Sequence, residues 1–237
     1  MTQYNPDDQG VLSIMYHRFE ENKYPSTNIR MNIFLQHIDA VKKNGFDFYD
    51  PKLFNEKFKE PKNNKKILLT IDDAFLSFYE NAWPILKKNK IPFILFVSTR
   101  EVGAFNYMTW DQIIEISKED FVEIGNHSHT HEYLIKETPD FIKRDIQKSI
   151  DIFKKNLGFN SDFFSYPFGE YSLEFKKIIK SLNFKYAFGQ HSGVIDLNKD
   201  KFELPRFPIN EKYGELKRFM SIINYFPLEY KNIFPEE

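Results

Sequence analysis

The chain has 237 residues, of which 41% are apolar and 28% are charged, and its formal net charge is −1. This composition is typical of a globular protein, and the charge balance lacks the basic footprint that nucleic acid or an anionic membrane surface requires. The chain contains no cysteine, which excludes disulfides, zinc–thiolate sites and thiol nucleophiles.

Short apolar runs alternate with amphipathic stretches along the whole chain. The apolar runs predict strands that are buried on both faces, and they lie at 11–16, 47–49, 66–71, 92–98, 121–125, 162–166, 184–188 and 202–205. The stretches between them predict helices over 31–44, 78–90, 109–117, 138–158, from Ser172 onward, and 214–224. Seven or eight such units indicate a parallel sheet covered by helices. An irregular (β/α) barrel fits this order better than an open sheet, although the sequence does not decide between them.

Five of the predicted strands are followed by side chains that can bind a metal, move a proton or clamp an anion. In a (β/α) barrel the carboxyl ends of the strands meet at one face, where the chemistry collects. These strand ends carry His17, Asp72 with Asp73, His127 with His129 and His131, the Pro167-Phe168-Gly169 turn, and Arg206. We therefore expect one site at this face.

Asp72 and Asp73 directly follow the apolar run ILLTI. Adjacent residues of a strand point to opposite sides, so the two carboxylates are expected to do different jobs: one binds a metal and the other handles protons. The structural alternative is an Asx turn or the N-cap of the next helix.

Three of the six histidines of the chain lie within HSHTH, residues 127–131. His127 and His131 are four residues apart, which predicts two imidazoles on one side of a helical turn, with His129 on another side. One Asp and two His leave coordination positions open for water and substrate, as a catalytic divalent site needs. The structural alternative is a polar loop or a helix start capped by Ser128 or Thr130.

Three segments together resemble the motifs of the polysaccharide deacetylases, the NodB-homology or carbohydrate esterase family 4 group. They are TIDDAF (70–75), HSHTH (127–131) and SYPFG (165–169), and the resemblance runs from about residue 11 to about residue 215. The resemblance implies a single catalytic domain over 1–237, folded as an irregular (β/α)7–8 barrel. It also implies a hydrolase that removes N-acetyl groups from the amino sugars of a glycan and releases acetate.

By position, the resemblance assigns Asp72 as the base and Asp73, His127 and His131 as ligands of a divalent metal. Zinc is the first expectation, and Co²⁺, Ni²⁺ or Fe²⁺ suit the same donors. VLSIMYH (11–17) resembles the first strand of a circularly permuted branch that includes the poly-N-acetylglucosamine deacetylases, which assigns His17 as the acid.

Further residues are expected near the substrate. The resemblance implies that the main-chain N–H of Phe168, fixed by Pro167 and followed by Gly169, stabilises the oxyanion. His191 follows the predicted strand 184–188, and Trp110 follows 92–98, which makes both candidates for substrate contact. For Trp110, an ordinary anchor at a helix start is the alternative.

The chain departs from the family pattern at three positions. Ala74 stands where the family has Gly, Ser165 where it has Arg, and Phe168 where it has Tyr. Without the Arg the base would lack its orienting partner, unless Arg206 supplies the guanidinium.

Two other functions stay open at the level of sequence: another metal-dependent amidase or deacylase, and a degenerate glycan-binding module. The expected partner is an N-acetylated glycan; no nucleic acid is expected, and the oligomeric state is unreadable. No apolar run approaches the ~18 residues that a membrane span needs. Residues 1–10 lack the apolar segment of a signal peptide, whereas the family resemblance implies an extracytoplasmic enzyme.

Overall fold

Nine strands form one mixed, largely parallel sheet in the part of the chain that the computed structural model describes, residues 10–54, 65–196 and 199–224. The strands are β1 (Val11–Tyr16), β4 (Asp47–Phe48), β5 (Lys66–Ile71), β6 (Phe93–Val97), β7 (Val122–Asn126), β8 (Phe163–Ser165), β9 (Tyr186–Phe188), β10 (Val194–Ile195) and β11 (Phe207–Pro208). Their order is β10-β1-β5-β6-β7-β8-β9, with β4 beside β5 and β11 beside β1. Among the described strands of this sheet, β1 and β10 form the only antiparallel pair. The polar N-terminal segment 1–9, discussed above, lies outside the described residues.

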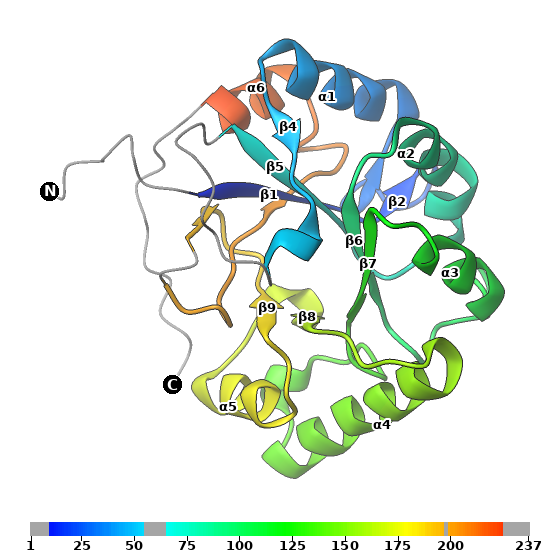
Figure 1. Cartoon of the computed structure of the whole chain (residues 1–237), viewed down its shortest axis with the longest axis vertical. Coiled ribbons are helices and arrows are strands. Elements are labelled where there is room, and N and C mark those ends of the chain that lie inside the picture. The colour runs from blue at the N-terminus through cyan, green and yellow to red at the C-terminus, as the bar shows by residue number, and fades with distance from the viewer. Residues whose placement is uncertain (1–9, 55–64, 197–198, 225–237) are drawn as a thin grey trace, which may run out of the picture.

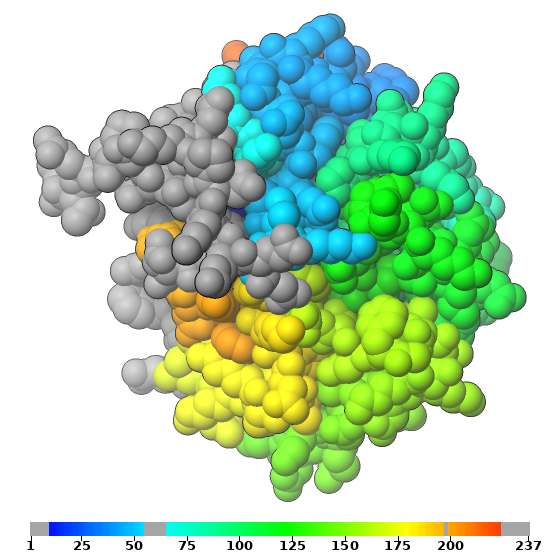
Figure 2. All heavy atoms as spheres, viewed as in Figure 1, coloured from blue at the N-terminus to red at the C-terminus, as the bar shows by residue number. Residues whose placement is uncertain are grey.

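Helices surround the strands, as the alternating sequence pattern predicts. Figure 1 shows α1 to α5 arranged around the outside with the strands at the centre, and Figure 2 shows successive units side by side around the molecule. The helices are α1 (Met31–Lys43), α2 (Trp83–Asn89), α3 (Trp110–Ser117), α4 (Pro139–Leu157), α5 (Leu173–Ser181) and α6 (Leu216–Asn224). Shorter elements are β2 (Arg18–Phe19), β3 (Asn28–Ile29), the 3-10 turns η1 (Pro51–Phe54), η3 (Leu134–Lys136) and η4 (Pro167–Gly169), and the π-helical turn η2 (Phe78–Ala82). This architecture confirms the predicted irregular (β/α) barrel.

Helix ends follow the predicted capping chemistry. Thr109 and Gln112 form a reciprocal capping box at the start of α3, and the Thr138 side chain accepts the Phe141 N–H at the start of α4. Gly158 ends α4 with a φ of 81°, a left-handed conformation that glycine adopts without strain. No helix among the described residues is long and apolar enough to cross a membrane.

The strand predicted at 202–205 is wrong. Only Leu204 pairs there, through an isolated bridge to Phe188 of β9, and the strand proper is β11 at Phe207–Pro208. Pro205 has no amide hydrogen, so it cannot continue a ladder. The segment 204–208 thereby crosses from β9 to β1, where Phe207 pairs with Ile14, and Arg206 lies at this crossing.

The helix predicted over 78–90 begins differently from the expectation. Residues 78–82 form the wider π-helical turn η2 before the regular helix α2. Pro84 has no amide hydrogen to donate into the preceding turn, which accounts for the irregular start.

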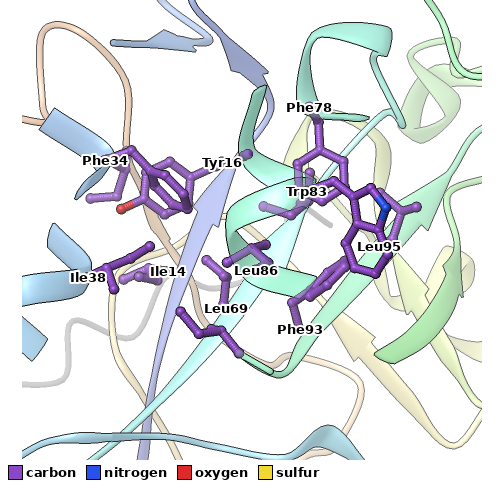
Figure 3. Packing of buried hydrophobic residues seen from close by; sticks show 14 of the residues in the cluster. Ile14, Tyr16, Phe34, Ile38, Leu69, Phe78, Trp83, Leu86, Phe93 and Leu95 are labelled. Carbon is purple, nitrogen blue, oxygen red and sulfur yellow. The ribbon is translucent and has the colours of Figure 1, made fainter. Parts of the chain in front are cut away.

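Successive side chains along each strand point alternately to the helices outside and to the interior of the barrel, so the sheet has an outer and an inner face. On β5, Ile67, Leu69 and Ile71 belong to the outer core beneath α1 and α2, which Figure 3 shows packed around Leu69 with Phe34, Ile38, Trp83 and Leu86. Leu68 belongs instead to an inner cluster. Other members of this inner cluster include Ile94, Phe96, Phe163, Tyr186 and Phe188. Because side chains alternate, Thr70 and Ser165 continue the inner face toward the carboxyl ends of β5 and β8.

Candidate metal and catalytic site

Asp72 and Asp73 lie just beyond β5, where the strand gives way to a turn. The Asp72 N–H still donates to the carbonyl of Tyr16 at 2.9 Å, but Asp73 and Ala74 have φ values of 72° and 53°. A left-handed turn, rather than the pleat of a strand that we predicted, therefore separates the two carboxylates. Asp72 is buried, whereas Asp73 is half-buried.

Ala74 explains how the chain does without the family glycine. Its backbone takes the left-handed conformation that glycine would favour, at a cost of about 1–2 kcal/mol for an L-residue. The Ala74 carbonyl accepts the Met108 N–H at 3.0 Å, and the Leu76 N–H donates to the Asn106 carbonyl at 2.8 Å. These contacts with the loop after β6 hold the strained turn in place.

The histidine cluster lies in a loop after β7, so the predicted helical turn is wrong. Ser128 and His131 have φ values of 69° and 53°, and these two left-handed residues bring the imidazoles together. Nε2 of His127 and Nε2 of His131 lie 3.5 Å and 3.2 Å from Oδ1 of Asp73. His129 turns away and hydrogen-bonds with Oγ1 of Thr99 through Nδ1 at 2.9 Å.

His127 is held in the tautomer that a metal ligand needs. Its Nδ1 donates to the carbonyl of Ser165 at 2.7 Å, which leaves the Nε2 lone pair facing Asp73. Burial lowers the pKa of His127 to about 4, against the opposing charge of Asp72, so the ring is neutral at pH 7.

The donor set fits a divalent ion. One carboxylate oxygen and two imidazole nitrogens, from Asp73, His127 and His131, all lie within 4.8 Å of one another. The ligand atoms of a tetrahedral ion with bonds of ~2.0–2.1 Å are about 3.3–3.4 Å apart, which is close to the two Asp73–imidazole distances.

Arg206 supplies a guanidinium to Asp72, although Ser165 stands where the family pattern has an arginine. Its Nη1 donates to Oδ1 of Asp72 at 2.6 Å, and its Nη2 donates to Oγ of Ser165 at 2.8 Å. The Ser165 hydroxyl in turn donates to Oδ2 of Asp72 at 3.2 Å. Nε of Arg206 donates to the carbonyl of Gly189 at 2.9 Å, so the guanidinium is anchored to the end of β9 as well.

This ring of hydrogen bonds keeps Asp72 ionised despite its burial. Burial raises the pKa of the Asp72 carboxyl, but the positive charge of Arg206, smaller electrostatic contributions from His127 and His17, and the hydrogen bond from Arg206 together lower that pKa to about 2. Arg206 is only 1% exposed, and its charge is compensated by Asp72. A buried, paired and oriented carboxylate is thus set beside the donor set for the ion.

An open pocket of about 170 Å³ lies over these groups. Its lining includes His17, Asp72, Asp73, His127, His131, Phe168 and Gly169, which the sequence analysis singled out. Phe168 has a φ of 59° and its ring lies 5.0 Å from that of His131. Pro167 is buried beneath this turn.

The remaining residues that line the pocket were missed by the sequence analysis. They are Ser26, Thr27, Gln190, Pro208, Ile209 and Asn210. Nδ2 of Asn210 donates to the carbonyl of Ser26 at 2.8 Å, which joins two loops that are far apart in the chain. No motif marks these residues, so no local signal could have identified them.

Two predicted substrate contacts do not line this pocket. Trp110 packs edge-on against Phe153 and the outer core, which is the structural alternative. His191 is half-buried near Tyr171, and its main-chain carbonyl accepts the main-chain N–H of Arg206 at 2.9 Å. The neighbouring Gln190 lines the pocket instead.

Residues 59–187, more than half of the chain, match the sequence model of the polysaccharide deacetylase family. The chain therefore belongs to the polysaccharide deacetylases. The matched range includes both aspartates and the histidine loop, whereas His17 and Arg206 lie outside it.

The curated relatives agree with this family, and two solved structures share the fold. The chain is 29% identical over 171 residues to a poly-β-1,6-N-acetyl-D-glucosamine N-deacetylase of Staphylococcus aureus, and 25% identical over 170 residues to that of Staphylococcus epidermidis. These alignments cover 67% and 66% of this chain but only 58% of each relative. The deacetylase PplD of Streptococcus pyogenes superposes with a TM-score of 0.80 at 23% identity, over 90% of this chain and 98% of its own. IcaB from Ammonifex degensii gives 0.80 at 24% identity, over 92% and 98%.

Proposed function

We propose that this protein is a metal-dependent hydrolase that removes N-acetyl groups from the amino sugars of a polysaccharide or glycoconjugate. The observation that carries the proposal is the pairing of Asp72 with Arg206 directly beside the Asp73–His127–His131 donor set. An oriented carboxylate next to a site for a Lewis acid is an arrangement that can catalyse hydrolysis of an amide. The names of the staphylococcal relatives support a polymer of N-acetylglucosamine as substrate.

The ion would be held by Asp73, His127 and His131, and zinc is our first choice, with Co²⁺, Ni²⁺ or Fe²⁺ as alternatives. When bound, a divalent ion polarises a carbonyl and acidifies water. Three protein ligands would leave coordination positions of the ion free, and the pocket beside Asp73, His127 and His131 has room for water and an acetamide group.

Asp72 accepts the proton of the attacking water as the new C–O bond forms at the acetamide carbon. Arg206 and Ser165 hold this carboxylate so that an oxygen stays aimed at the pocket. The main-chain N–H of Phe168 donates to the oxyanion in this proposal, with Pro167 and Gly169 shaping the turn. His17, at the pocket wall, donates a proton to the leaving nitrogen as the C–N bond breaks. The products are acetate and a free amino sugar.

The test is acetate release from β-1,4- and β-1,6-linked N-acetylglucosamine oligomers. Metal-stripped protein, zinc- or cobalt-reloaded protein and Asp73→Ala would be compared. We expect release only from the reloaded wild type, and the faster substrate would define the linkage. Stoichiometric zinc with no release from either oligomer would instead favour another acyl substrate or a glycan-binding module. An extracytoplasmic location, which the family resemblance implies, remains part of this proposal.

A further inference from the structure

The loop that carries both imidazoles does not adopt its shape on local preference alone. Ser128 and His131 both sit in the left-handed region, which costs about 1–2 kcal/mol for each non-glycine residue. Such a conformation persists only where the surroundings hold it. The contacts that hold residues 127–131 therefore decide where the two Nε2 atoms lie.

One side of the loop is held by residues 98–100, which directly follow β6 and donate hydrogen bonds to carbonyls of the loop. The Thr99 and Arg100 N–H groups donate to the carbonyls of Ser128 and His129 at 3.2 Å and 3.0 Å. The Ser98 hydroxyl donates to the carbonyl of His127 at 2.8 Å.

The other side of the loop is held by a single carboxylate from α4. Oδ1 of Asp145 accepts the His129 N–H at 2.8 Å, and Oδ2 accepts the Thr130 N–H at 3.1 Å. Asp145 is only 6% exposed, so its charge is stabilised largely by these main-chain donors. One helical turn further on, the Ser149 hydroxyl donates to Oδ1 of Asn126 at 3.0 Å, which fixes the start of the same loop.

We propose that Asp145 is a positioning residue for the metal site. Its carboxylate accepts the N–H groups of His129 and Thr130, two of the three residues between His127 and His131, and so sets the separation of the two imidazole nitrogens. The inference rests on the metal site of the proposed function, but it concerns the geometry of that site and not its substrate. Asp145 touches neither the ion nor the glycan and acts only through the loop.

The matched pair of variants is Asp145→Asn and Asp151→Asn. Both remove one negative charge from α4, but Asp151 is exposed and bonds with Gln147 rather than with the loop. In Asp145→Asn an NH₂ group replaces an acceptor and faces a loop N–H. Co²⁺ affinity and the visible absorption of the bound Co²⁺ would be measured in both, with Asp73→Ala as the control that identifies the site.

We expect Asp145→Asn to bind Co²⁺ about 10–100-fold more weakly, as is typical when an outer partner of a metal ligand is lost, and with an altered visible spectrum. Asp151→Asn should match wild type. Wild-type affinity and spectrum in Asp145→Asn would overturn the inference. If that variant does not fold, Asp145→Glu takes its place. This change keeps the charge but moves the carboxylate by one methylene. We expect Asp145→Glu to bind Co²⁺ more weakly than wild type, and unchanged binding would contradict the inference. Failure of the proposed metal site would give a different result from failure of this inference. In that case Asp73→Ala would bind Co²⁺ as tightly as the wild type does.

Discussion

His37 and His127 are both buried histidines, and they differ in what their ring nitrogens face. His37 belongs to α1 and faces β1 and α6 in the outer layer. Its Nδ1 accepts from the Tyr16 hydroxyl at 2.8 Å, its Nε2 donates to the carbonyl of Gly214 at 2.7 Å, and its ring stacks on Phe219 with centroids 4.0 Å apart. His127 lies on the inner face, and only its Nδ1 is used by the main chain.

Burial is the main cause that lowers the pKa of both rings to about 4, so neither burial nor charge state separates them. The difference lies in the second nitrogen. A histidine with both nitrogens satisfied connects structural elements, whereas one whose free lone pair faces a carboxylate and a pocket is available to bind a metal ion. The changes at His127 and His37 test the two sides of this contrast, and the changes at Arg206 and Ala74 test the contacts that hold the neighbouring aspartates.

The largest effect is expected at the inner histidine. His127→Ala removes one ligand of the donor set, so we expect acetate release by the reloaded protein to fall about 10³-fold or more, while the fold is kept. Initial rates and circular dichroism would be compared with wild type. Near-normal turnover with metal bound would remove His127 from the site.

Arg206→Met tests the charge pair on which the inner face depends. The change leaves the Asp72 carboxylate buried without its cation, which typically costs about 3–5 kcal/mol of the free energy of unfolding. Urea unfolding would measure it. The double variant Arg206→Met with Asp72→Asn should recover part of the loss, and no recovery would contradict the pairing.

His37→Phe should remove both hydrogen bonds of the outer histidine and leave the metal site unchanged. The change keeps the ring stack but leaves the Tyr16 hydroxyl and the Gly214 carbonyl without their partner. We expect a loss of about 2–4 kcal/mol in the free energy of unfolding. Co²⁺ affinity measured on the folded variant should equal that of wild type, and a large change would undo the contrast between the two histidines.

The pH dependence of stability should carry the signature of His37. The unfolded chain binds a proton at His37 below a pKa of about 6.5, whereas the folded chain binds it only near pH 4. The free energy of unfolding therefore falls as the pH drops from 6.5 to 4, by at most about 3 kcal/mol for this group. Urea unfolding of metal-free wild type and His37→Phe over this range should give a smaller slope in the variant, and equal slopes would contradict the assignment.

The smallest effect is expected at the turn after β5. Ala74→Gly relieves a left-handed alanine but frees the unfolded chain, so a net gain of at most about 1 kcal/mol is expected. Thermal unfolding would measure it. A clear loss of stability would mean that the Ala74 methyl group, buried in the outer core, contributes more than its strain costs.

Much of the fold was predictable because it depends on local patterns. Apolar runs placed β1 and the strands from β4 to β9, but not the short β2 and β3, and capping residues such as Thr109 and Thr138 placed helix starts. The strand at 202–205 failed because pairing there depends on β9 and β1, which lie far away in the chain. The histidine loop was predicted as a helical turn because the spacing of four residues between His127 and His131 does not reveal that Ser128 and His131 adopt left-handed conformations.

The sequence by itself determined the chemistry that is available: an Asp-Asp pair, a histidine cluster and a proline turn, each at the end of a strand. Only the tertiary structure decided how these groups are held. Arg206 meets Asp72 across 134 positions of the chain, and Asp145 reaches the histidine loop from another element. The physical reason is that a strand or a cap is chosen by neighbouring residues, whereas a buried charge finds its partner only when the barrel brings distant segments to one face.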